Sequence, residues 1–598
     1  MSRGWGPAGG EVASGRGLRK KGLRNLRRLG VYVRPYRLRL LGAILAMFGV
    51  LGCTLALPLL LKTAIDSAII PGDTRLLIGI AGVVVLIGLA GIGLGRVETY
   101  LTGWVGERVL NDLRTDLFRH LQTLSLGYFE RRRTGVLISR LTNDVEALQQ
   151  LVTDGITSTV RNVLTLVVAG GILLVLDWRL ALATVVVFPA MAVMTFVFRG
   201  QSARAYGQMR QRLGLVTAAL QEDLNGIRVI QAYRREASSR AQIAELNQSY
   251  RDANHRTVTS SGWYFPTVEI LAAIATCIVF GYGGYLYVDG AIEIGVLVAF
   301  IGYLASFFDP VQQLSQVYNT FLAGSAALDK ILDVMDDAPA IVDAPDAVPL
   351  AAIRGQVAFE DVRFGYDPER PVLEGLDIAV AAGQTVALVG HTGAGKSTII
   401  KLLARFYDPQ AGRILIDGTD VRRVTQHSLR DQIAIVPQEG FLFNGTIHEN
   451  IAFGRPDATR AEVAAAAREV GADAFIDDLP EGYDTPVQER GGRLSIGQRQ
   501  LIAFARALLV DPRLLILDEA TSSVDIRTEA RIEDALRRLL HGRTAFVVAH
   551  RLSTIRGADL IVVLEHGRVV EQGTHDELIA LGGRYRGLYG DWAEAAAG

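Results

Sequence analysis

The sequence predicts two domains, an all-α domain of six membrane-spanning helices followed by an α/β domain. Long apolar runs, most of them near the roughly 20 residues that cross a hydrocarbon core, occur only in the first half of the chain. In the second half, short β-rich runs alternate with helical patterns, which is typical of an α/β domain. A length of 598 residues would suit about four soluble domains, and the apolar half reduces that expectation to two.

The composition excludes several classes of protein. The chain has 49% hydrophobic residues, and 62 Lys and Arg balance 62 Asp and Glu. This excludes a disordered chain, and the lack of a basic excess argues against a nucleic-acid partner. Two cysteines exclude a disulfide scaffold and a cysteine-based metal cluster. The mean hydropathy of +0.25 indicates that part of the chain lies in lipid.

The balanced charge hides an asymmetry at the N-terminus. Residues 1–39 contain eleven Lys and Arg against Glu11 alone, so this segment carries +10 and the rest of the chain −10. A mitochondrial transit peptide would also be basic, whereas a signal peptide would need an apolar run that residues 1–30 lack. By the positive-inside rule, we expect 1–39 to be a basic cytoplasmic arm with an elbow helix.

Six apolar runs predict a transmembrane domain over 40–335. The last run should continue as a helix past Asp309 and Pro310 and leave the membrane. An even number of spans places both ends of this domain on one side of the bilayer. The runs are Leu40–Leu61, Leu76–Gly95, Ile156–Leu176, Leu180–Phe198, Phe265–Val288 and Gly295–Phe308.

The connections between the spans differ in length. Those after spans 1, 3 and 5 are short, whereas Arg96–Gly155 and Arg199–Tyr264 are long, charged and helically patterned. We expect them to be helical extensions into water on the side of the basic arm. Two independent soluble insertions are the less favoured alternative, because neither segment has a strand or turn pattern.

A Pro- and Asp-rich stretch separates the two halves. It predicts a linker over 336–354, followed by the α/β domain over 355–598. The predicted strands include Thr385–Val389, Arg413–Ile416, Leu514–Leu517 and Ala545–Val548.

A glycine-rich sequence, Gly-His-Thr-Gly-Ala-Gly-Lys-Ser, runs from Gly390 to Ser397. It follows the strand Thr385–Val389 and opens a helix predicted over Ser397–Leu403, the context that a phosphate-binding loop requires. Its glycines let backbone N–H groups close around phosphates, and Lys396 adds charge near the β- and γ-phosphates. The Ser397 hydroxyl can ligate Mg²⁺.

An apolar strand over 514–517 ends in two acids, Asp518 and Glu519. Asp518 would hold Mg²⁺ as a Walker-B acid, and Glu519 beside the metal could polarise an attacking water. An acid pair that merely caps a strand is the plainer alternative. The phosphate-binding loop in the same domain favours nucleotide hydrolysis.

Further motifs follow in order and resemble the nucleotide-binding domains of ABC transporters. Gln438 resembles the glutamine of the Q-loop, and Leu-Ser-Ile-Gly-Gln at 494–498 resembles the family's signature. Asp525 resembles the D-loop aspartate, and His550 after an apolar strand resembles the switch histidine. Tyr366 resembles the aromatic that stacks on adenine. Taken alone, Tyr366 would be an ordinary strand aromatic and His550 a core histidine.

The resemblance covers about 355–590 and implies ATP and Mg²⁺ as cofactors. It implies that Glu519 orients the water, His550 contacts the γ-phosphate and Lys396 neutralises phosphate charge, which makes these three the candidate catalytic residues. The candidate Mg²⁺ ligands are Ser397, Gln438 and Asp518, and the candidate nucleotide-binding residues are Tyr366, Gly390, Thr392, Gly393, Gly395, Lys396, Ser397, Thr398, Gln438, Ser495, Gly497, Gln498 and Asp525.

The membrane half resembles the exporter type of the same family, with matching segments at 134–144 and 222–229. The resemblance implies coupling helices at about Leu126–Arg133 and Thr217–Asn225 that dock on nucleotide domains. Without the resemblance, both segments would be taken for solvated charged helices.

The resemblance also implies a dimer. In this family the phosphate-binding loop of one nucleotide domain and the signature of another enclose each ATP, and this chain has one of each. Position 496 is Ile where the family usually has Gly, while Glu519 and His550 are retained. This combination resembles one subunit of a heterodimeric exporter with one degenerate site. A heterodimer is favoured, and a homodimer with a tolerated variant stays open.

The implied function is ATP-driven export of amphipathic drugs or lipids by alternating access, in a bacterial inner or plasma membrane. The expected partners are a second half-transporter, the bilayer and a hydrophobic or amphipathic small molecule, with the nucleotide domain and N-terminus cytoplasmic. A dedicated transporter of a peptide, siderophore or other metabolite is the main alternative. A non-transporting gate or regulator is the third, and an intact Glu519 argues against it.

Side chains near spans 5 and 6 leave the substrate open. Aromatics there suit an amphipathic substrate but could equally face lipid. Glu269 and Asp309 could line a cavity or lie at the interface. The aromatics are Tyr264, Phe265, Phe280, Tyr282, Tyr285, Tyr303, Phe307 and Phe308.

Overall fold

The computed structural model describes residues 28–597, except 368, 439, 489–490, 519–525 and 550. The chain forms two compact units. The first comprises Met1–Thr123 and Arg133–Ala338, and the second comprises Leu124–Arg132 and Pro339–Gly598. Most of the basic arm lies outside the described residues, and a helical stretch over 28–36 precedes the first span.

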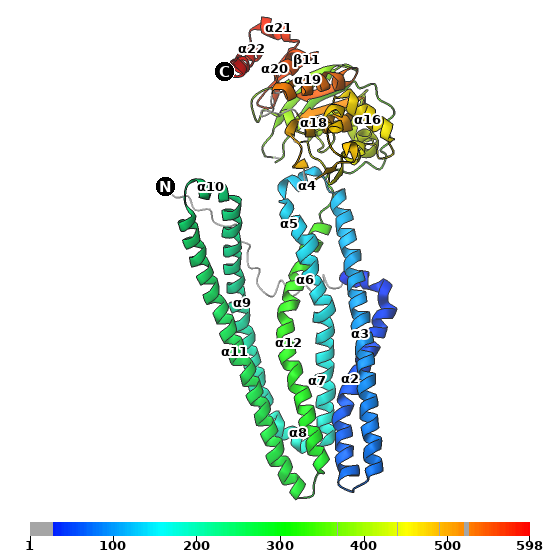
Figure 1. The fold of residues 1–598 in the computed structure, drawn as a ribbon, viewed down its shortest axis with the longest axis vertical. Coiled ribbons are helices and arrows are strands. Elements are labelled where there is room, and N and C mark those ends of the chain that lie inside the picture. Colours follow the sequence, from blue (N-terminus) through cyan, green and yellow to red (C-terminus); the bar gives the residue numbers. More distant parts are fainter. Residues whose placement is uncertain are drawn as a thin grey trace. The chain divides into compact units, whose positions relative to one another are not determined.

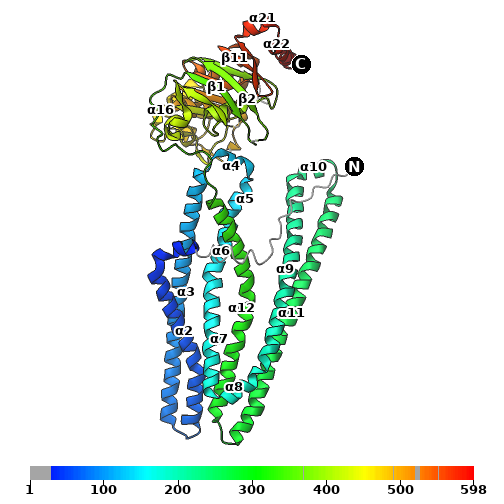
Figure 2. The ribbon, with the colours of Figure 1, turned by 180° about the vertical axis from the view of Figure 1, so that it is seen from behind.

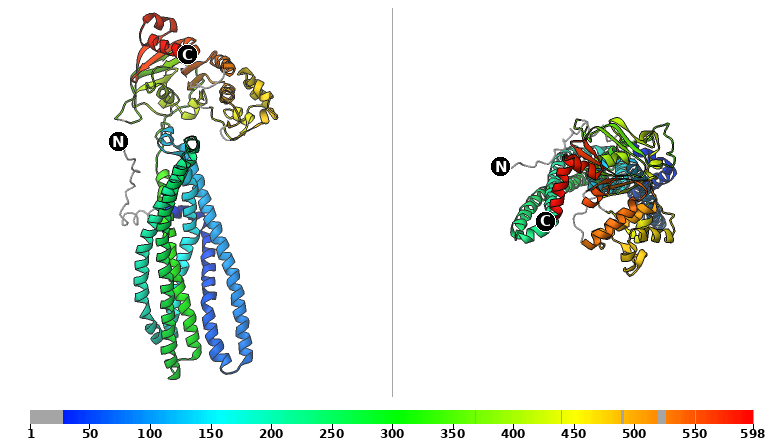
Figure 3. Two further views of the ribbon diagram at one scale, coloured as in Figure 1. Left: turned by 60° about the vertical axis from the view of Figure 1, so that its left-hand side comes forward. Right: turned by 90° about the horizontal axis from the view of Figure 1, so that it is seen from above.

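The first unit is built from helices, and six of its helical segments are long and apolar enough to cross a membrane. This confirms the six predicted spans. Figures 1 and 3 show the long helices of this unit running side by side. In chain order they are α2 (Arg37–Thr63), α3 (Thr74–Thr123), α7 (Thr157–Leu176), α8 (Trp178–Val185), α9 (Val187–Asn225), α11 (Glu236–Val288) and α12 (Ile294–Met335).

Both long connections are helical, as their spacing predicts. The helix α3 runs 50 residues, and α11 runs 53, so each continues well beyond its apolar run. Between α3 and α7 the chain forms α4 (Leu126–Arg131), α5 (Thr134–Ser139) and α6 (Val145–Gln150), together with π-helical turns.

The second expected coupling helix is placed differently. We expected it at Thr217–Asn225, but α9 continues unbroken to Asn225. The separate short helix is α10, at Ile227–Ala232, after a break at Gly226. Gly226 lies at φ −90° and ψ 9°, outside the helical region, so the separate short helix begins about ten residues later than the expected one.

Pro58, Pro266 and Pro310 lie inside membrane helices, beyond the first turn, without ending them. Pro310 lies within α12, which confirms that this helix continues past Asp309 to Met335. Pro58 lies within α2 and faces Gly302 on α12. A Cβ on Gly302 would lie only 3.3 Å from the proline ring, so the glycine lets α2 and α12 approach closely. The buried Tyr303 hydroxyl donates to the Leu55 carbonyl across the same contact. Hydrogen bonding of this kind keeps backbone oxygens satisfied where water is absent.

Several of the aromatics near spans 5 and 6 pack in the helix bundle. Tyr264 stacks on Phe198 with ring centroids 4.0 Å apart, and its hydroxyl lies 3.2 Å from that of Thr195. Tyr303 and Phe308 are also buried. These rings stabilise the fold, whereas Phe280, Tyr282 and Tyr285 are exposed, as are Glu269 and Asp309.

The second unit is built around a six-stranded sheet in the order β12-β11-β3-β10-β9-β6. A second, antiparallel sheet has the order β2-β1-β4-β5, and its strands β1 and β2 are labelled in Figure 2. The strands are β1 (Val357–Phe364), β2 (Leu373–Val380), β3 (Thr385–Val389), β4 (Ala411–Ile416), β5 (Thr419–Asp420), β6 (Ile433–Val436), β7 (Gly445–Thr446), β8 (Pro486–Val487), β9 (Leu514–Asp518), β10 (Thr544–Val548), β11 (Leu560–Glu565) and β12 (Arg568–Gly573).

Helices complete the second unit. They pack with the strands into two apolar cores, one of which includes the helical segment between β6 and β9. The helices are α13 (Lys396–Leu403), α14 (Gln426–Arg430), α15 (Ile447–Ala452), α16 (Arg460–Glu469), α17 (Asp473–Asp477), α18 (Ile496–Leu509), α19 (Ile526–Leu540), α20 (Leu552–Arg556), α21 (His575–Leu581) and α22 (Arg584–Ala597).

Most of the predicted linker is fixed to the second unit. Arg405, 1% exposed, donates to the Val424 carbonyl at 2.7 Å and to the Val342 carbonyl at 3.4 Å. The Asp343 carboxylate accepts from Arg405 and from the backbone N–H of Gln426 at 3.0 Å. A buried guanidinium therefore attaches this segment to the domain that follows it.

Replacing Arg405 with Met should destabilise the second unit by about 3–5 kcal/mol, because Asp343 and several buried carbonyls lose their donor. Thermal unfolding of the purified chain measures the change. The unfolding transition whose midpoint rises when ATP is added is assigned to the second unit. Arg413→Met is the matched control, since Arg413 is 58% exposed and pairs with Glu360 at the surface, where a salt bridge contributes about 0–1 kcal/mol. Equal effects of the two changes would contradict the anchoring role.

Candidate nucleotide-binding site

The sheet of the second unit brings the predicted motifs to one edge. The strands β11, β3, β10, β9 and β6 run parallel to one another, and β12 pairs with β11 in the antiparallel direction. The glycine-rich loop follows β3, Asp518 ends β9, and Gln438 lies two residues after β6. Ligands bind beyond the carboxyl ends of parallel strands in open α/β sheets. Of the remaining candidates, Glu519, Asp525 and His550 lie outside the described residues.

Three glycines of the loop hold conformations with positive φ. Gly390, Gly393 and Gly395 have φ of 150°, 86° and 104°. A Cβ on Gly390 would lie 2.3 Å from the Leu564 carbonyl oxygen, and one on Gly395 would lie 2.7 Å from Leu373. The loop path therefore requires glycine at these two positions for space as well as for conformation.

Lys396 lies in the loop with its ammonium group turned inward. It donates to the carbonyl oxygens of Gly390 at 2.7 Å and His391 at 3.0 Å. Burial lowers the pKa of Lys396, and the charge of Asp518 opposes that shift. A charge held close to the loop's own backbone is suited to an incoming phosphate.

Residues beside the loop differ in exposure. Ser397 and Thr392 are exposed, whereas Thr398 is buried and its hydroxyl lies 3.2 Å from that of Tyr366. Tyr366 packs edge-to-face on Tyr407, with ring centroids 5.3 Å apart, and the residue is 42% exposed. An exposed aromatic face beside the loop can stack on a base.

The signature residues begin the helix α18 at a separate place in the unit. Ser495 and Gln498 form a capping box: the Ser495 hydroxyl accepts from the Gln498 N–H at 3.2 Å, and the Gln498 side chain accepts from the Ser495 N–H at 2.8 Å. Gly497 is buried, whereas the Ile496 side chain is 45% exposed. The isoleucine therefore leaves the helix start intact and changes only its outer surface.

The resemblance implies that Leu126–Arg133 docks on a nucleotide domain, but the sequence does not identify the residues that the segment contacts, one network of which reaches the base-stacking candidate. The Glu130 carboxylate, on α4, accepts from the Lys401 ammonium at 2.7 Å and from the Tyr407 hydroxyl at 2.6 Å. The Lys401 ammonium lies 5.4 Å from the ring centroid of Tyr366. The helix α4 belongs to the second unit, so this short segment between two membrane helices contacts residues around Tyr366 directly.

The charges of this network hold it together. Burial taken alone would raise the pKa of Glu130, but hydrogen bonds from Lys401 and Tyr407 outweigh it, so that pKa lies below its usual range. Burial and the Glu130 carboxylate raise the pKa of Tyr407, which remains a hydrogen-bond donor. In the sequence, the charged run of Glu and Arg after Phe129 is the one sign of this network, and it does not identify Lys401 and Tyr407 as the partners of Glu130.

Gly390→Ala should weaken ATP binding about tenfold or more, because relieving the 2.3 Å contact with Leu564 must move the loop. Binding of a fluorescent ATP analogue measures this. Gly383→Ala is the control, since Gly383 also has a positive φ, of 83°, but open space around its Cβ position. Equal weakening of ATP binding by both changes would show that the contact with Leu564 is not the cause.

Glu130→Gln should speed amide hydrogen exchange of α4 about tenfold, because it removes a charged acceptor from two hydrogen bonds. In the unaltered chain, the lowered pKa means that this stabilisation is present above the ordinary carboxyl pKa and is lost as pH falls through the folded value. Glu360→Gln, at the surface of the same unit, should leave α4 unchanged. Unaltered exchange in the Glu130 variant would rule out the attachment.

Comparisons with known proteins agree with this geometry. The family model of the ABC transporter transmembrane region matches residues 40–311, and the ABC transporter family model matches residues 373–522. An uncharacterised ABC transporter ATP-binding protein of Bacillus subtilis is 41% identical over 563 residues, covering 94% of this chain and 93% of that protein. An ATP-dependent lipid A-core flippase of Syntrophus aciditrophicus is 37% identical, covering 97% of each.

A solved structure shows the same fold. A bacterial Atm1-family ABC exporter with ATP bound superposes with a TM-score of 0.79 at 34% identity, covering 94% of this chain and 98% of that one. The membrane region, the ATP-binding domain and these relatives extend over nearly the whole chain. The chain therefore belongs to the ABC transporter family, as an exporter-type protein whose six-span membrane domain and ATP-hydrolysing domain share one polypeptide.

Proposed function

We propose that two such chains, or this chain and a related one, export amphipathic small molecules by ATP-driven alternating access. The observation that carries the assembly is the separation of the two nucleotide motifs. The glycine-rich loop opens α13, whereas the signature opens α18. Each chain supplies one of each, so a second chain would complete two ATP sites. ATP that binds the closed pair more tightly than the open pair would shift the equilibrium toward closure.

The residues at the sheet edge fit Mg²⁺ together with ATP. Ser397 is exposed at the start of α13, Asp518 ends β9 close enough to influence Lys396, and Gln438 follows β6. Hydroxyl, amide and carboxylate oxygens are donors that Mg²⁺ accepts alongside phosphates. A bound Mg²⁺ would neutralise charge on the phosphates, and Lys396 would add a second positive charge on them.

The remaining roles concern the attacking water and the neighbouring chain. We propose that Glu519 orients the water and His550 contacts the γ-phosphate. Ser495 and Gly497 would meet the ATP held by the partner, and Asp525 would lie near the same junction.

Ile496 supports a heterodimer. Its exposed side chain lies at the helix start that would face the partner's nucleotide, where the family usually has Gly. A branched side chain there obstructs the approach of phosphate to the backbone N–H groups of the helix start. The site that receives this signature would therefore be the weaker one, and the site built on this chain's Glu519 the active one.

An amphipathic substrate has support from the relatives. One is named a lipid A-core flippase, and a Bacillus subtilis protein, 38% identical over 94% of this chain, is named as a candidate multidrug export ATP-binding/permease protein. Stimulation of ATP hydrolysis in liposomes across drugs, lipids and peptides tests this class. Stimulation by peptides or metal chelates alone would favour a dedicated metabolite transporter instead.

We also propose that the protein lies in a bacterial plasma membrane with its ATP-binding domain in the cytoplasm. The helical extensions beyond the apolar runs carry many arginines, and cytoplasmic loops are enriched in basic residues.

Glu519→Gln should abolish nearly all ATP hydrolysis by the assembled pair, because the other site would lack a full catalytic set. Single-turnover hydrolysis by the purified pair measures this, and ATP binding to the variant serves as the control. A purified chain that alone forms a dimer with two equally active sites would overturn the heterodimer. Ile496→Gly should then leave the rate within about twofold.

A further inference from the structure

A pocket of about 500 Å³ lies between α9 and α11 in the first unit. These two helices run side by side in Figures 1 and 2. The lining residues repeat at helical spacing, so each helix contributes one continuous face to the pocket. They include Arg204 and Gln208 on α9, and Arg256, Ser260 and Trp263 on α11.

The pocket is positively charged and rich in hydrogen-bond donors. Two arginines line it, and no Asp or Glu does so within the part of the chain that the structure describes. Arg256 makes a long contact of 3.4 Å with the Gln208 side chain. The hydroxyl of Ser260 is buried and has no hydrogen-bond partner. Such a set of donors without a negative partner is suited to an anion with several oxygens.

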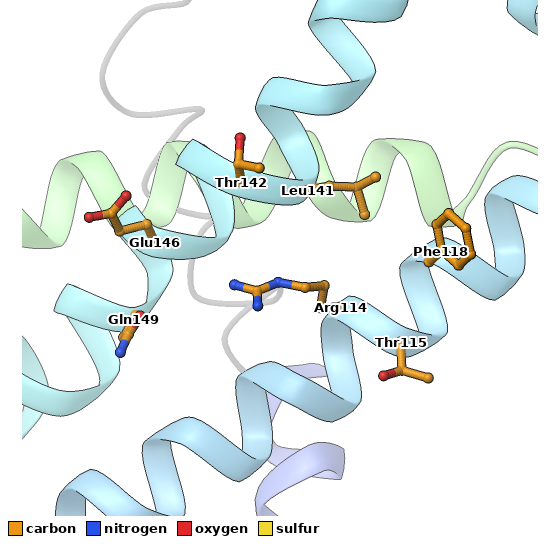
Figure 4. Close-up of a pocket in the computed structure, with 7 residues that line it drawn as sticks. All are labelled: Arg114, Thr115, Phe118, Leu141, Thr142, Glu146 and Gln149. Atoms are coloured by element: carbon orange, nitrogen blue, oxygen red, sulfur yellow. The ribbon is translucent and has the colours of Figure 1, made fainter. Parts of the chain in front are cut away.

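A second pocket shows that this charge pattern is not general. It has a volume of about 710 Å³ and lies between α3 and the segment around α6. Figure 4 shows the Arg114 guanidinium extending between these elements, with Glu146 lining the same pocket. In that pocket Glu146 accompanies the positive charge of Arg114. A change at Arg114 is therefore a matched control for changes at the arginines on α9 and α11.

The pocket begins just beyond the apolar runs, which is where we place the lipid head groups. Arg204 is six residues after Phe198, which is about 9 Å along a helix. Its side chain leans toward the N-terminal end of α9, and therefore toward the apolar run, whereas the side chain of Arg256, nine residues before Phe265, leans toward the N-terminal end of α11 and away from that run. Trp263, two residues before Phe265, is 75% exposed. Tryptophan at this depth is typical of the boundary between lipid and water.

We propose that this pocket binds the anionic head group of a membrane phospholipid, with Arg204 and Arg256 on the phosphate and Trp263 beside the upper acyl chains. Ser260 supplies a further donor. The site concerns a lipid of the surrounding membrane and does not depend on which molecule is exported. A soluble phosphate ester would meet the same donors, but neither the depth of the pocket nor the exposed indole would help to bind it.

The test uses the purified full-length chain in neutral detergent, titrated with phosphatidylglycerol or with phosphatidylcholine and followed by native mass spectrometry. Phosphatidylglycerol should bind more tightly than phosphatidylcholine. Arg204→Gln and Arg256→Gln should each weaken it about fivefold, and together about 25-fold. Arg114→Gln should change it less than twofold. Lysine at both positions should restore most of the affinity, which separates loss of charge from damage to the fold.

Two results would overturn the proposal. One is equal retention of phosphatidylglycerol by the double glutamine variant and the unaltered chain. The other is binding of free glycerol 3-phosphate as tightly as phosphatidylglycerol, with the same loss in the variants, which would assign the pocket to a soluble anion. Because the substituted positions are exposed, circular dichroism and basal ATP hydrolysis should remain unchanged in every variant.

Discussion

The parallel order of the central strands determines where the chemistry of this protein lies. Val548 on β10 pairs with Leu388 on β3 and with Asp518 on β9, so one strand separates the glycine-rich loop from the acid. Neighbouring strands lie about 4.8 Å apart, which keeps the two groups within about 10 Å. The electrostatic influence of Asp518 on Lys396 follows from this register. The pairing of the strands is therefore sufficient to bring the glycine-rich loop and Asp518 together.

A different constraint governs the first unit. Backbone groups have no water to bond to in lipid, so the spanning segments must be helices, and even their prolines are accommodated inside them. Aromatic stacking, such as that of Tyr264 on Phe198, and close contacts at glycine then decide how the helices pack. The same helices continue beyond their apolar runs, where their surfaces become charged and can carry polar pockets.

The features that were predictable from sequence depend on local spacing. The strand Thr385–Val389 and the six spans follow from periodicity and length, and the structure has them. Contacts between distant segments were not predictable. The partners of Glu130 lie 271 and 277 residues further along the chain, and the anchoring of the linker by Arg405 is likewise set by tertiary packing. The segment expected to be a separate short helix, 217–225, belongs to α9, because the helical pattern continues through it and Gly226 alone marks its end.

The membership of α4 in the second unit has a practical consequence. The polypeptide passes from one unit to the other after Thr123, after Arg132 and after Ala338, so the ATP-hydrolysing unit is assembled from two separate stretches of chain. A fragment that begins at the linker would lack Glu130. It would leave the ammonium of Lys401 and the hydroxyl of Tyr407 without their acceptor, next to the ring that we expect to hold adenine. Nucleotide affinities measured on such an excised domain would therefore describe a unit that lacks α4.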